Sequence, residues 1–185
     1  MESPNDDLQY FSRIPWCRAH LEEPGAITTV SPSCKAKDTA EDELFARTLR
    51  TTNTIRAFVA IYRLPESPQQ EIIRDFKYLI SLQQGLSGYP GVCHGGIVAT
   101  VLDEVLGIPF LFNQMHNNLL DGAHMTGELT VKYLRPVPLR CSLLCRVSIV
   151  RSEGRKYFVN GHIEDENGDV LAKGESIYIS LKPKL

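Results

Sequence analysis

The sequence GYPGVCHGGIVATVLDEVLG, residues 88–107, decides how the rest of this chain can fold. Its first part is rich in glycine, which is typical of a tight loop. Its second part predicts a mostly apolar helix from about residue 95 to about residue 112. Asp103 interrupts the apolar run. Because an unpaired buried charge is costly, a carboxylate in such a run is usually paired or functional. Asp103 is therefore the first candidate site residue.

A projection of this helix separates two faces. At about 100° per residue, four residues fall on one narrow stripe, namely Gly96, Thr100, Asp103 and Gly107. The opposite side is apolar and is expected to pack on a sheet: Val98, Val101, Leu102, Val105 and Ile108. The projection predicts that Asp103 points away from that sheet, about 10 Å along the helix from its N-terminus.

The beginning of the helix offers a second chemical group. The N–H groups of Gly95 and Gly96 lie in the first turn, where backbone donors are unpaired and the helix dipole is positive. Such donors can hold a developing oxyanion, and a carboxylate further along can act as a base or a nucleophile. This combination suits acyl transfer to water. The residues also allow a simpler interpretation, in which the glycines only shape a loop and Asp103 pairs with an arginine at a subunit interface.

The other elements follow from periodicity and from breakers. Residues 1–38 contain prolines at positions 4, 15, 24 and 32, so we expect an irregular N-terminal arm. A helix is predicted for about 39–51, a helical or turn segment for 70–75, and a loop for 113–123. Alternating or β-branched runs predict strands at 54–63, from about 76, and at 125–134, 142–151, 156–164 and 170–180. One long helix with an antiparallel sheet is an α+β arrangement.

Composition narrows the function. At 185 residues the chain is expected to form one domain plus an arm. The formal net charge of -2 gives no electrostatic reason to expect a nucleic acid partner or an anionic membrane surface. No uninterrupted apolar run reaches the roughly 18–20 residues of a transmembrane segment. Cys141 and Cys145 have no partners at zinc-ligand spacing, so no metal is expected.

The two ends of the chain bear on location. The acidic start lacks the basic and apolar regions of a signal peptide, and reduced cysteines would suit an intracellular protein, so we expect a cytoplasmic location. The C-terminal residues Pro183, Lys184 and Leu185 resemble the Ser-Lys-Leu peroxisomal signal, with proline in the first position. A peroxisomal location is the alternative.

Three motifs carry a family resemblance. His94-Gly-Gly followed after six residues by Asp103 resembles the hotdog-fold thioesterases of the phenylacetic-acid-degradation type. MTGELTVKYLRPVPL at 125–139 and EGRKYFV at 153–159 are similar to mammalian thioesterase superfamily members that hydrolyse long-chain acyl-CoA. The resemblance covers about residues 54–182. It implies a hotdog fold over residues 39–185, in which a curved antiparallel sheet wraps around one long helix.

The resemblance also implies a reaction and an assembly. The substrate would be an acyl-CoA or acyl-carrier thioester, hydrolysed without a cofactor. The working unit would be a homodimer or a dimer of dimers (a homotetramer), with sites at the subunit interface. Asp103 would activate water or attack the thioester, and the N–H of Gly96, together with that of Gly95, would polarise the carbonyl. Thr126, from the partner subunit, would position the water.

The remaining residues of the resemblance would bind the substrate or hold the loop before the helix. Coenzyme A would contact Lys132, Arg155, Lys156 and Asn160. Basic side chains at these positions make sense against phosphates. His94 would fix the loop through a hydrogen bond. Glu104 departs from the relatives, and since adjacent helical residues diverge by about 100°, it is expected to be a solvent or interface acid.

Other functions remain open. A non-catalytic hotdog protein that binds acyl-CoA or a protein partner is the main alternative. A Cys93–His94 nucleophile pair is disfavoured, because sequence neighbours cannot easily aim at each other. A lipase-type hydrolase needs a Gly-x-Ser-x-Gly turn, which the sequence does not contain. A hotdog dehydratase would use a catalytic histidine, and the only histidine of the motif precedes the helix.

Overall fold

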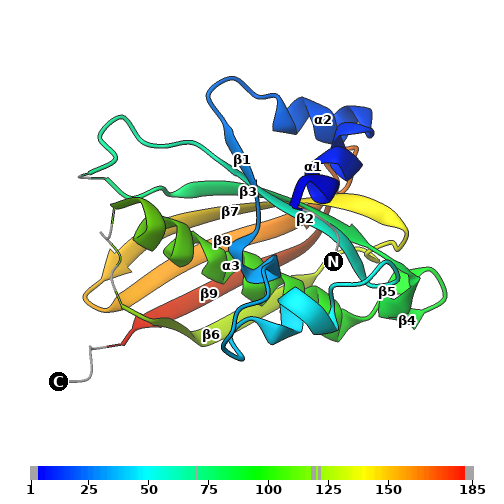
Figure 1. The fold of residues 1–185 in the computed structure, drawn as a ribbon. Coiled ribbons are helices and arrows are strands. Elements are labelled where there is room, and N and C mark those ends of the chain that lie inside the picture. The colour runs from blue at the N-terminus through cyan, green and yellow to red at the C-terminus, as the bar shows by residue number, and fades with distance from the viewer. Residues whose placement is uncertain (1–3, 70, 118–119, 121, 182–185) are drawn as a thin grey trace.

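The computed structural model describes residues 4–69, 71–117, 120 and 122–181. Its main feature is one antiparallel sheet in the strand order β1-β2-β3-β7-β8-β9-β6 (Figure 1). The strands are β1 (Ile27–Val30), β2 (Ile55–Tyr62), β3 (Asp75–Leu82), β6 (His124–Tyr133), β7 (Cys141–Glu153), β8 (Lys156–Glu164) and β9 (Val170–Ser180). The six strands predicted from the sequence are all present, and β1 is an additional one.

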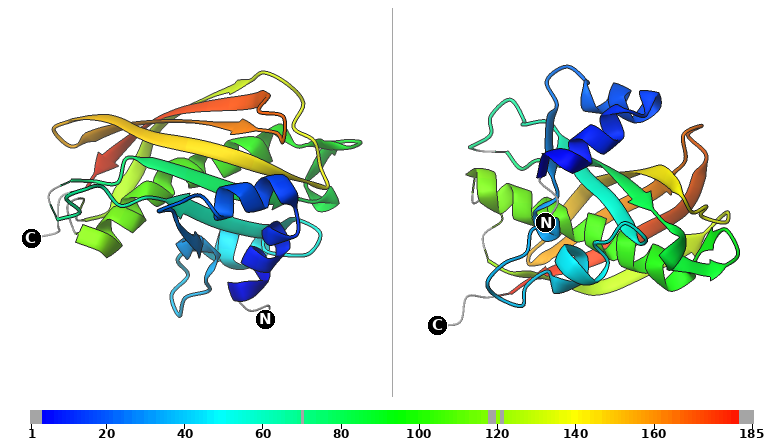
Figure 2. Two further views of the ribbon diagram at one scale, coloured as in Figure 1. Left: turned by 90° about the horizontal axis from the view of Figure 1, so that it is seen from above. Right: turned by 45° about the vertical axis from the view of Figure 1, so that its right-hand side comes forward.

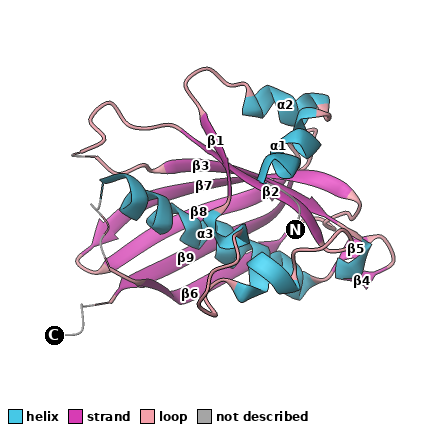
Figure 3. Cartoon of the chain, in the orientation of Figure 1, coloured by secondary structure: helices cyan, strands magenta, loops and turns pink. Residues whose placement is uncertain are grey.

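One long helix, α3 (Gly95–Asn117), lies across the curved sheet (Figures 1 and 3). The two views of Figure 2 show the strands curving around it. This arrangement confirms the predicted α+β hotdog architecture. The apolar face of the helix is fully buried, as the projection predicted: Val98, Val101, Leu102, Val105 and Ile108 are each at most 2% exposed.

The helix comes close to the sheet because two glycines face it. Gly161 on β8 and Gly174 on β9 are cross-strand partners, and a Cβ atom on either would lie 3.0 Å from a methyl group of Leu106. Real Cβ atoms rarely approach so closely, so side chains at these two positions would push α3 outward. The glycine pair therefore sets the depth at which α3 and its site residues lie.

The helix is longer than predicted. It runs to Asn117, so the loop expected at 113–123 begins later. Asn113 is fully buried there, where its side chain hydrogen-bonds to both backbone groups of Ile73 and to the carbonyl of Pro109. The bonds to Ile73 tie the end of α3 to the segment before β3. A polar residue therefore lies inside the helix because its amide is fully satisfied.

The length and composition of α3 also bear on the membrane question. Gly95–His116 is long and apolar enough to cross a membrane by those two measures, although the sequence has no uninterrupted apolar run of that length. Half of this segment is buried inside the protein. A helix that packs in a protein core meets the same two measures, and the apolar face of α3 packs in this way.

The prediction of an irregular N-terminal arm is wrong for most of that segment. The structure has helices α1 (Pro4–Ser12) and α2 (Pro15–Leu21), a short helical turn η1 (Pro32–Cys34), and strand β1. Each of these helical elements begins with one of the prolines that we took as breakers. Proline is tolerated in the first helical turn, because the N–H that it lacks would be unpaired there anyway.

Helices α1 and α2 cover the face of the sheet that is turned away from α3. Phe11 and Cys17 are fully buried and pack with Val59 on β2, Leu79 on β3 and Leu144 on β7 in a second, smaller core. The N-terminal segment therefore stabilises the back of the sheet. Figure 1 shows the two helices beside β2 and β3.

Two further local predictions need correction. The helix expected at 39–51 is reduced to one wide turn, η2 (Leu44–Thr48), and residues 71–74 form no helix before β3. A short 3-10 turn, η3 (Gln84–Leu86), and a small hairpin of β4 (Ser87–Tyr89) and β5 (Val92–Cys93) lead into α3. The C-terminal Pro183-Lys184-Leu185 motif lies outside the described residues.

Candidate functional site

The candidate site forms where α3 faces strand β6. The prediction that Asp103 points away from the sheet is wrong, because its carboxylate contacts this strand. Thr126 on β6 donates a hydrogen bond of 2.9 Å to Oδ1 of Asp103. Both side chains are at least partly exposed. The resemblance implied that Thr126 would act from the partner subunit, whereas here it contacts Asp103 of its own chain, which corrects that expectation. Within the described part of the chain no side chain binds Oδ2 of Asp103, so this oxygen is available for chemistry.

His94 fixes the beginning of α3, as predicted. Its Nδ1 accepts a hydrogen bond of 3.0 Å from the N–H of Gly96, and its carbonyl accepts from Ile97 and Val98. The backbone N–H of His94 donates to Leu86. His94 therefore acts as an N-cap through its imidazole, which must present an unprotonated Nδ1 to do so.

The histidine cap changes which backbone donor is available. Because the N–H of Gly96 is already bonded to His94, it is not the free donor that the sequence predicted. The N–H of Gly95 has no acceptor among the residues that the structure describes. On the other side of Gly95, its carbonyl accepts a hydrogen bond of 3.0 Å from the hydroxyl of Tyr133. Gly95 is therefore the better oxyanion candidate of the two.

Donor and carboxylate do not converge within one chain. Gly95 and Asp103 lie eight residues apart on α3, which corresponds to about 12 Å along a helix axis. A reacting carbonyl must lie about 3 Å from its oxyanion donor and close to the attacking group. One chain therefore supplies two halves of a site at separate places.

Glu104 was expected to be a solvent or interface acid, and the first of these alternatives is wrong. It is largely buried against the segment 31–48, close to Ser33, Lys37 and Asp42. Burial raises the pKa of Glu104 from 4.5 to about 7, despite a hydrogen bond from Ser33, and the neighbouring charges of Asp42 and Asp103 add to the increase. The sequence could not show this, because it does not reveal which segment covers that face of α3.

The Glu104 environment predicts a pH effect on stability. The folded state holds the proton of Glu104 up to about pH 7, whereas the unfolded chain releases it near pH 4.5. The free energy of unfolding therefore falls as the pH rises between these values. Glu104→Gln is expected to stabilise the protein by about 2–3 kcal/mol at pH 8 and to have little effect at pH 4. Urea unfolding at both pH values measures this, and an equal effect at both would contradict it.

The four predicted coenzyme A residues do not form one site with Asp103 within the chain. Lys132 pairs with Glu175 at 3.2 Å. Lys132 and Asn160 both lie on the face of the sheet opposite α3, because side chains alternate along a strand and their neighbours Val131 and Gly161 face α3. Arg155 and Lys156 lie in the turn from β7 to β8 and at the start of β8, and Arg155 donates to the carbonyl of Ser180.

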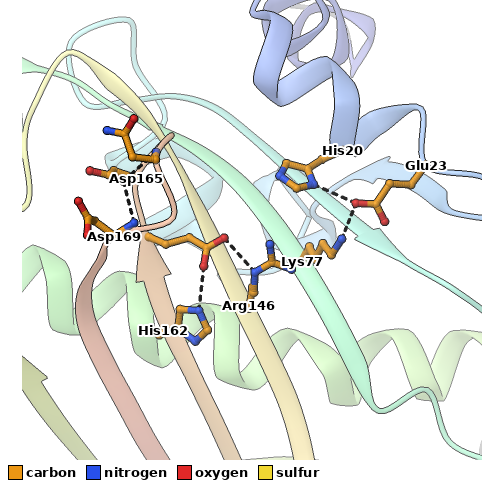
Figure 4. Close-up of polar contacts among 9 residues, drawn as sticks. His20, Glu23, Lys77, Arg146, His162, Asp165 and Asp169 are labelled. Atoms are coloured by element: carbon orange, nitrogen blue, oxygen red, sulfur yellow. Dashed lines mark hydrogen bonds and ion pairs between the residues drawn. The ribbon is translucent and has the colours of Figure 1, made fainter.

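The face opposite α3 carries its own network of ion pairs. Figure 4 shows Glu23 between His20 and Lys77, with Arg146 and His162 further along the strands. Arg146 and His162 both bind Glu164, at 2.9 and 3.0 Å. Although partial burial opposes its ionisation, hydrogen bonds from Lys77 and His20 lower the pKa of Glu23 to about 2. These bonds hold the connection after α2 onto β3.

Two cavities lie near the residues described above. The smaller one, of about 350 Å³, lies at the N-terminus of α3 and is lined by Gly95, Val98, Tyr133 and Arg135 among others. The larger one, of about 1010 Å³, lies at the end of the sheet where β2 ends and β3 begins, and its lining includes Tyr62, Phe76, Leu120, Tyr157 and the charged wall of Glu23, Lys77 and Arg146. The smaller cavity is the one that adjoins a predicted site residue.

Sequence reasoning missed two tyrosines. Tyr133 binds the Gly95 carbonyl, and Tyr178 on β9 donates a hydrogen bond of 2.8 Å to the backbone carbonyl of Asp103. Both lie on strands predicted correctly. Strand β6 has a bulge between Thr126 and Glu128, which shifts the alternation of its side chains. The sequence alone therefore could not show that Tyr133 and Thr126 both face α3. No sequence signal links Tyr178 to a residue 75 positions away.

Comparison with known proteins gives a consistent set of relatives. The family model "Thioesterase superfamily" matches residues 90–172. Acyl-coenzyme A thioesterase THEM4 of Xenopus laevis is 33% identical over 99 residues, which are 53% of this chain and 41% of the frog protein. This chain therefore spans less than half the length of that relative. A crystal structure of a thioesterase superfamily protein has a TM-score of 0.52 and 26% identity, covering 65% of this chain and 55% of that one.

A more distant relative matches along the whole sequence. Verlamelin biosynthesis protein B of a Lecanicillium species is 24% identical over 213 residues, which cover 100% of this chain and 92% of that protein. The match therefore extends through the N-terminal segment, which lies outside the family model's range.

Proposed function

We propose that this chain, whose residues 90–172 match the thioesterase superfamily model, hydrolyses the thioester of an acyl-coenzyme A. The observation that carries the proposal is the contact between Asp103 and Thr126, where α3 faces β6. A carboxylate held by a hydroxyl group, at a partly exposed position, suits the activation of water. The similarity to proteins named acyl-coenzyme A thioesterases supports coenzyme A as the thiol.

Asp103 would act on the carbonyl carbon in one of two ways. As a general base, Oδ2 takes a proton from water while the water oxygen attacks that carbon and the C–S bond breaks. As a nucleophile, the carboxylate attacks that carbon directly, the C–S bond breaks and the thiolate leaves, and water then hydrolyses the resulting anhydride. In both cases the products are the free acid and the thiol. Thr126 orients the carboxylate by binding Oδ1.

The oxyanion donor would come from a second copy of the chain. Within one chain Gly95 lies too far from Asp103, so a two-fold axis between two α3 helices is needed to bring a donor of one copy to the carboxylate of the other. Strand β6 supports such a dimer, because along its described length it pairs only with β9 and leaves its outer edge open. Met125 and Tyr133 on this edge strand are each more than half exposed. Long exposed edges are normally paired or protected.

A complementation experiment tests the shared site. Gly95→Pro removes one N–H at the first helical position, where proline is tolerated, and Asp103→Asn removes the carboxylate. Each variant alone is expected to be inactive. Mixed dimers restore one of two sites, so refolding the two variants together at equal amounts should recover about a quarter of wild-type turnover.

The outcome separates two arrangements. If each site used Gly95 and Asp103 of the same chain, mixing the two variants would restore no site. Absence of recovery, in a mixture proven dimeric by light scattering, would therefore contradict the shared site. Mixing Asp103→Asn with Thr126→Ala is the matched control. These two residues belong to the same half-site, so that mixture is expected to be no more active than the two variants measured separately.

Arg155 and Lys156 are the coenzyme A contacts that we retain. Both are exposed at the end of the sheet where β6 begins, and neither of them belongs to an ion pair described above. Guanidinium and ammonium groups there suit the phosphates of coenzyme A. Lys132 is the weakest of the four, since Glu175 already pairs with it.

The direct test is a panel of acyl-CoA esters from short to long, with aryl esters included, in which released thiol is measured. Turnover of at least one ester supports hydrolysis, and the preferred ester defines the acyl group. Binding of the esters without turnover would instead favour a non-catalytic acyl-binding protein.

A further inference from the structure

Tyr178 lies directly behind the candidate site. The residue is 3% exposed, and its hydroxyl donates a hydrogen bond of 2.8 Å to the backbone carbonyl of Asp103. On the sheet, Tyr178 is the cross-strand partner of Thr126. One side chain therefore contacts Asp103 through its backbone and adjoins the residue that holds the Asp103 carboxylate.

The helix is shaped to admit this hydroxyl. Gly107 lies one turn after Asp103, and a Cβ atom at this position would lie 3.1 Å from the hydroxyl oxygen of Tyr178. That distance is tighter than most real Cβ contacts allow. Glycine inside a helix costs about 1 kcal/mol relative to alanine, so it needs a local reason. Space for the Tyr178 hydroxyl supplies that reason.

The surroundings keep the hydroxyl protonated and fixed. Burial raises the pKa of Tyr178, despite a hydrogen bond with Thr126, so the group remains a donor throughout the neutral range. Phe110 packs against the ring, with the centroids 4.9 Å apart. The tyrosine cannot easily rotate away from α3, and the distance between β9 and α3 is thereby set at Asp103.

We infer that Tyr178 is a positioning residue, which fixes the Asp103 carboxylate relative to Thr126 by bonding the Asp103 backbone, with Gly107 as the cavity for its hydroxyl. The kinetic consequences of this inference rest on the proposed hydrolysis, whereas the positioning itself rests on the geometry of Tyr178, Asp103 and Gly107. It assigns Tyr178 no contact with the substrate. Removing its hydroxyl alters the chemical step and leaves substrate binding in place.

Tyr178→Phe tests the inference, with Tyr157→Phe as the matched control. Tyr157 is the cross-strand neighbour of Tyr178 on β8 and lines the larger cavity, away from Asp103. Tyr178→Phe is expected to lower kcat by about tenfold to a hundredfold, the effect of a small misplacement, while KM stays near wild type. Tyr157→Phe is expected to leave both constants unchanged. An unchanged kcat in folded Tyr178→Phe would overturn the inference.

Gly107→Ala adds a readout that separates position from stability. It is expected to lower kcat like Tyr178→Phe, although alanine favours the helix by about 1 kcal/mol. In the Tyr178→Phe background the same change should have no further effect on kcat, because both act through one hydroxyl. Additive losses in the double variant would contradict this shared route.

A measurement independent of turnover completes the test. The ¹³C chemical shift of the Asp103 carboxyl group is expected to change in Tyr178→Phe and in Gly107→Ala, and to stay constant in Tyr157→Phe. If the wild type hydrolyses no acyl-CoA, the proposed function fails, and this spectrum still decides the role of Tyr178. A constant shift in all three variants would refute that role.

Discussion

Replacing Asp103 with asparagine is expected to abolish hydrolysis of acyl-CoA, with a fall in kcat of about a thousandfold. Asparagine has the same shape and can still accept the hydrogen bond from Thr126, but it cannot take a proton or attack a thioester. The loss would therefore report the chemistry of the carboxylate. Release of free thiol from the best ester of the panel measures it.

The neighbouring carboxylate supplies the control. Glu104→Gln removes the next acid on the same helix, which is covered by the segment 31–48 and lies on a different side of α3 from Asp103. It is expected to keep wild-type turnover at pH 7. Persistence of full activity in folded, dimeric Asp103→Asn would rule out Asp103 as the catalytic group.

The largest effect on stability is expected at Asp7. This carboxylate is 1% exposed, forms an ion pair with Arg50, and accepts a hydrogen bond of 3.1 Å from the backbone N–H of Phe58 on β2. Asp7→Ala leaves a mostly buried guanidinium and a buried N–H group without their partner. The free energy of unfolding should fall by about 3–5 kcal/mol, as urea unfolding would measure.

Asp6 provides the comparison one residue away. It pairs with Arg56 at 3.0 Å, but its side chain is 30% exposed, so Asp6→Ala is expected to cost about 1 kcal/mol or less. Equal losses for the two variants would contradict the assigned role of burial at Asp7. A large loss at Asp7 alone would mean that α1 and the sheet unfold as one unit.

The N-terminal segment shows where sequence reasoning fails. Proline both interrupts helices and begins them, and only its position relative to the first turn distinguishes the two. The prolines at 4, 15 and 32 all begin helical elements here. The β-branched run Ile27–Val30 was a usable strand signal, which the surrounding prolines obscured.

The candidate site was predicted in part. The helical period separated Asp103 from the buried apolar residues of α3, but the prediction that Asp103 points away from the sheet is wrong, because its carboxylate contacts Thr126 on β6. The choice between Gly95 and Gly96 as donor could not be made from the sequence, because it depends on the imidazole of His94 turning back onto the helix. The contact of Thr126 with Asp103 needed the register of β6 against β9, including its bulge.

By itself, the sequence determined the six predicted strands and the apolar face of α3. Both follow from periods of about 2 and 3.6 residues, which backbone geometry imposes on any strand or helix. Only the tertiary structure decided what surrounds Asp103: Thr126, 23 residues away, Tyr178, 75 residues away, and the buried neighbour Glu104 under an N-terminal segment. These contacts depend on strand register and on the close approach of α3 to Gly161 and Gly174, which arise from packing between distant segments.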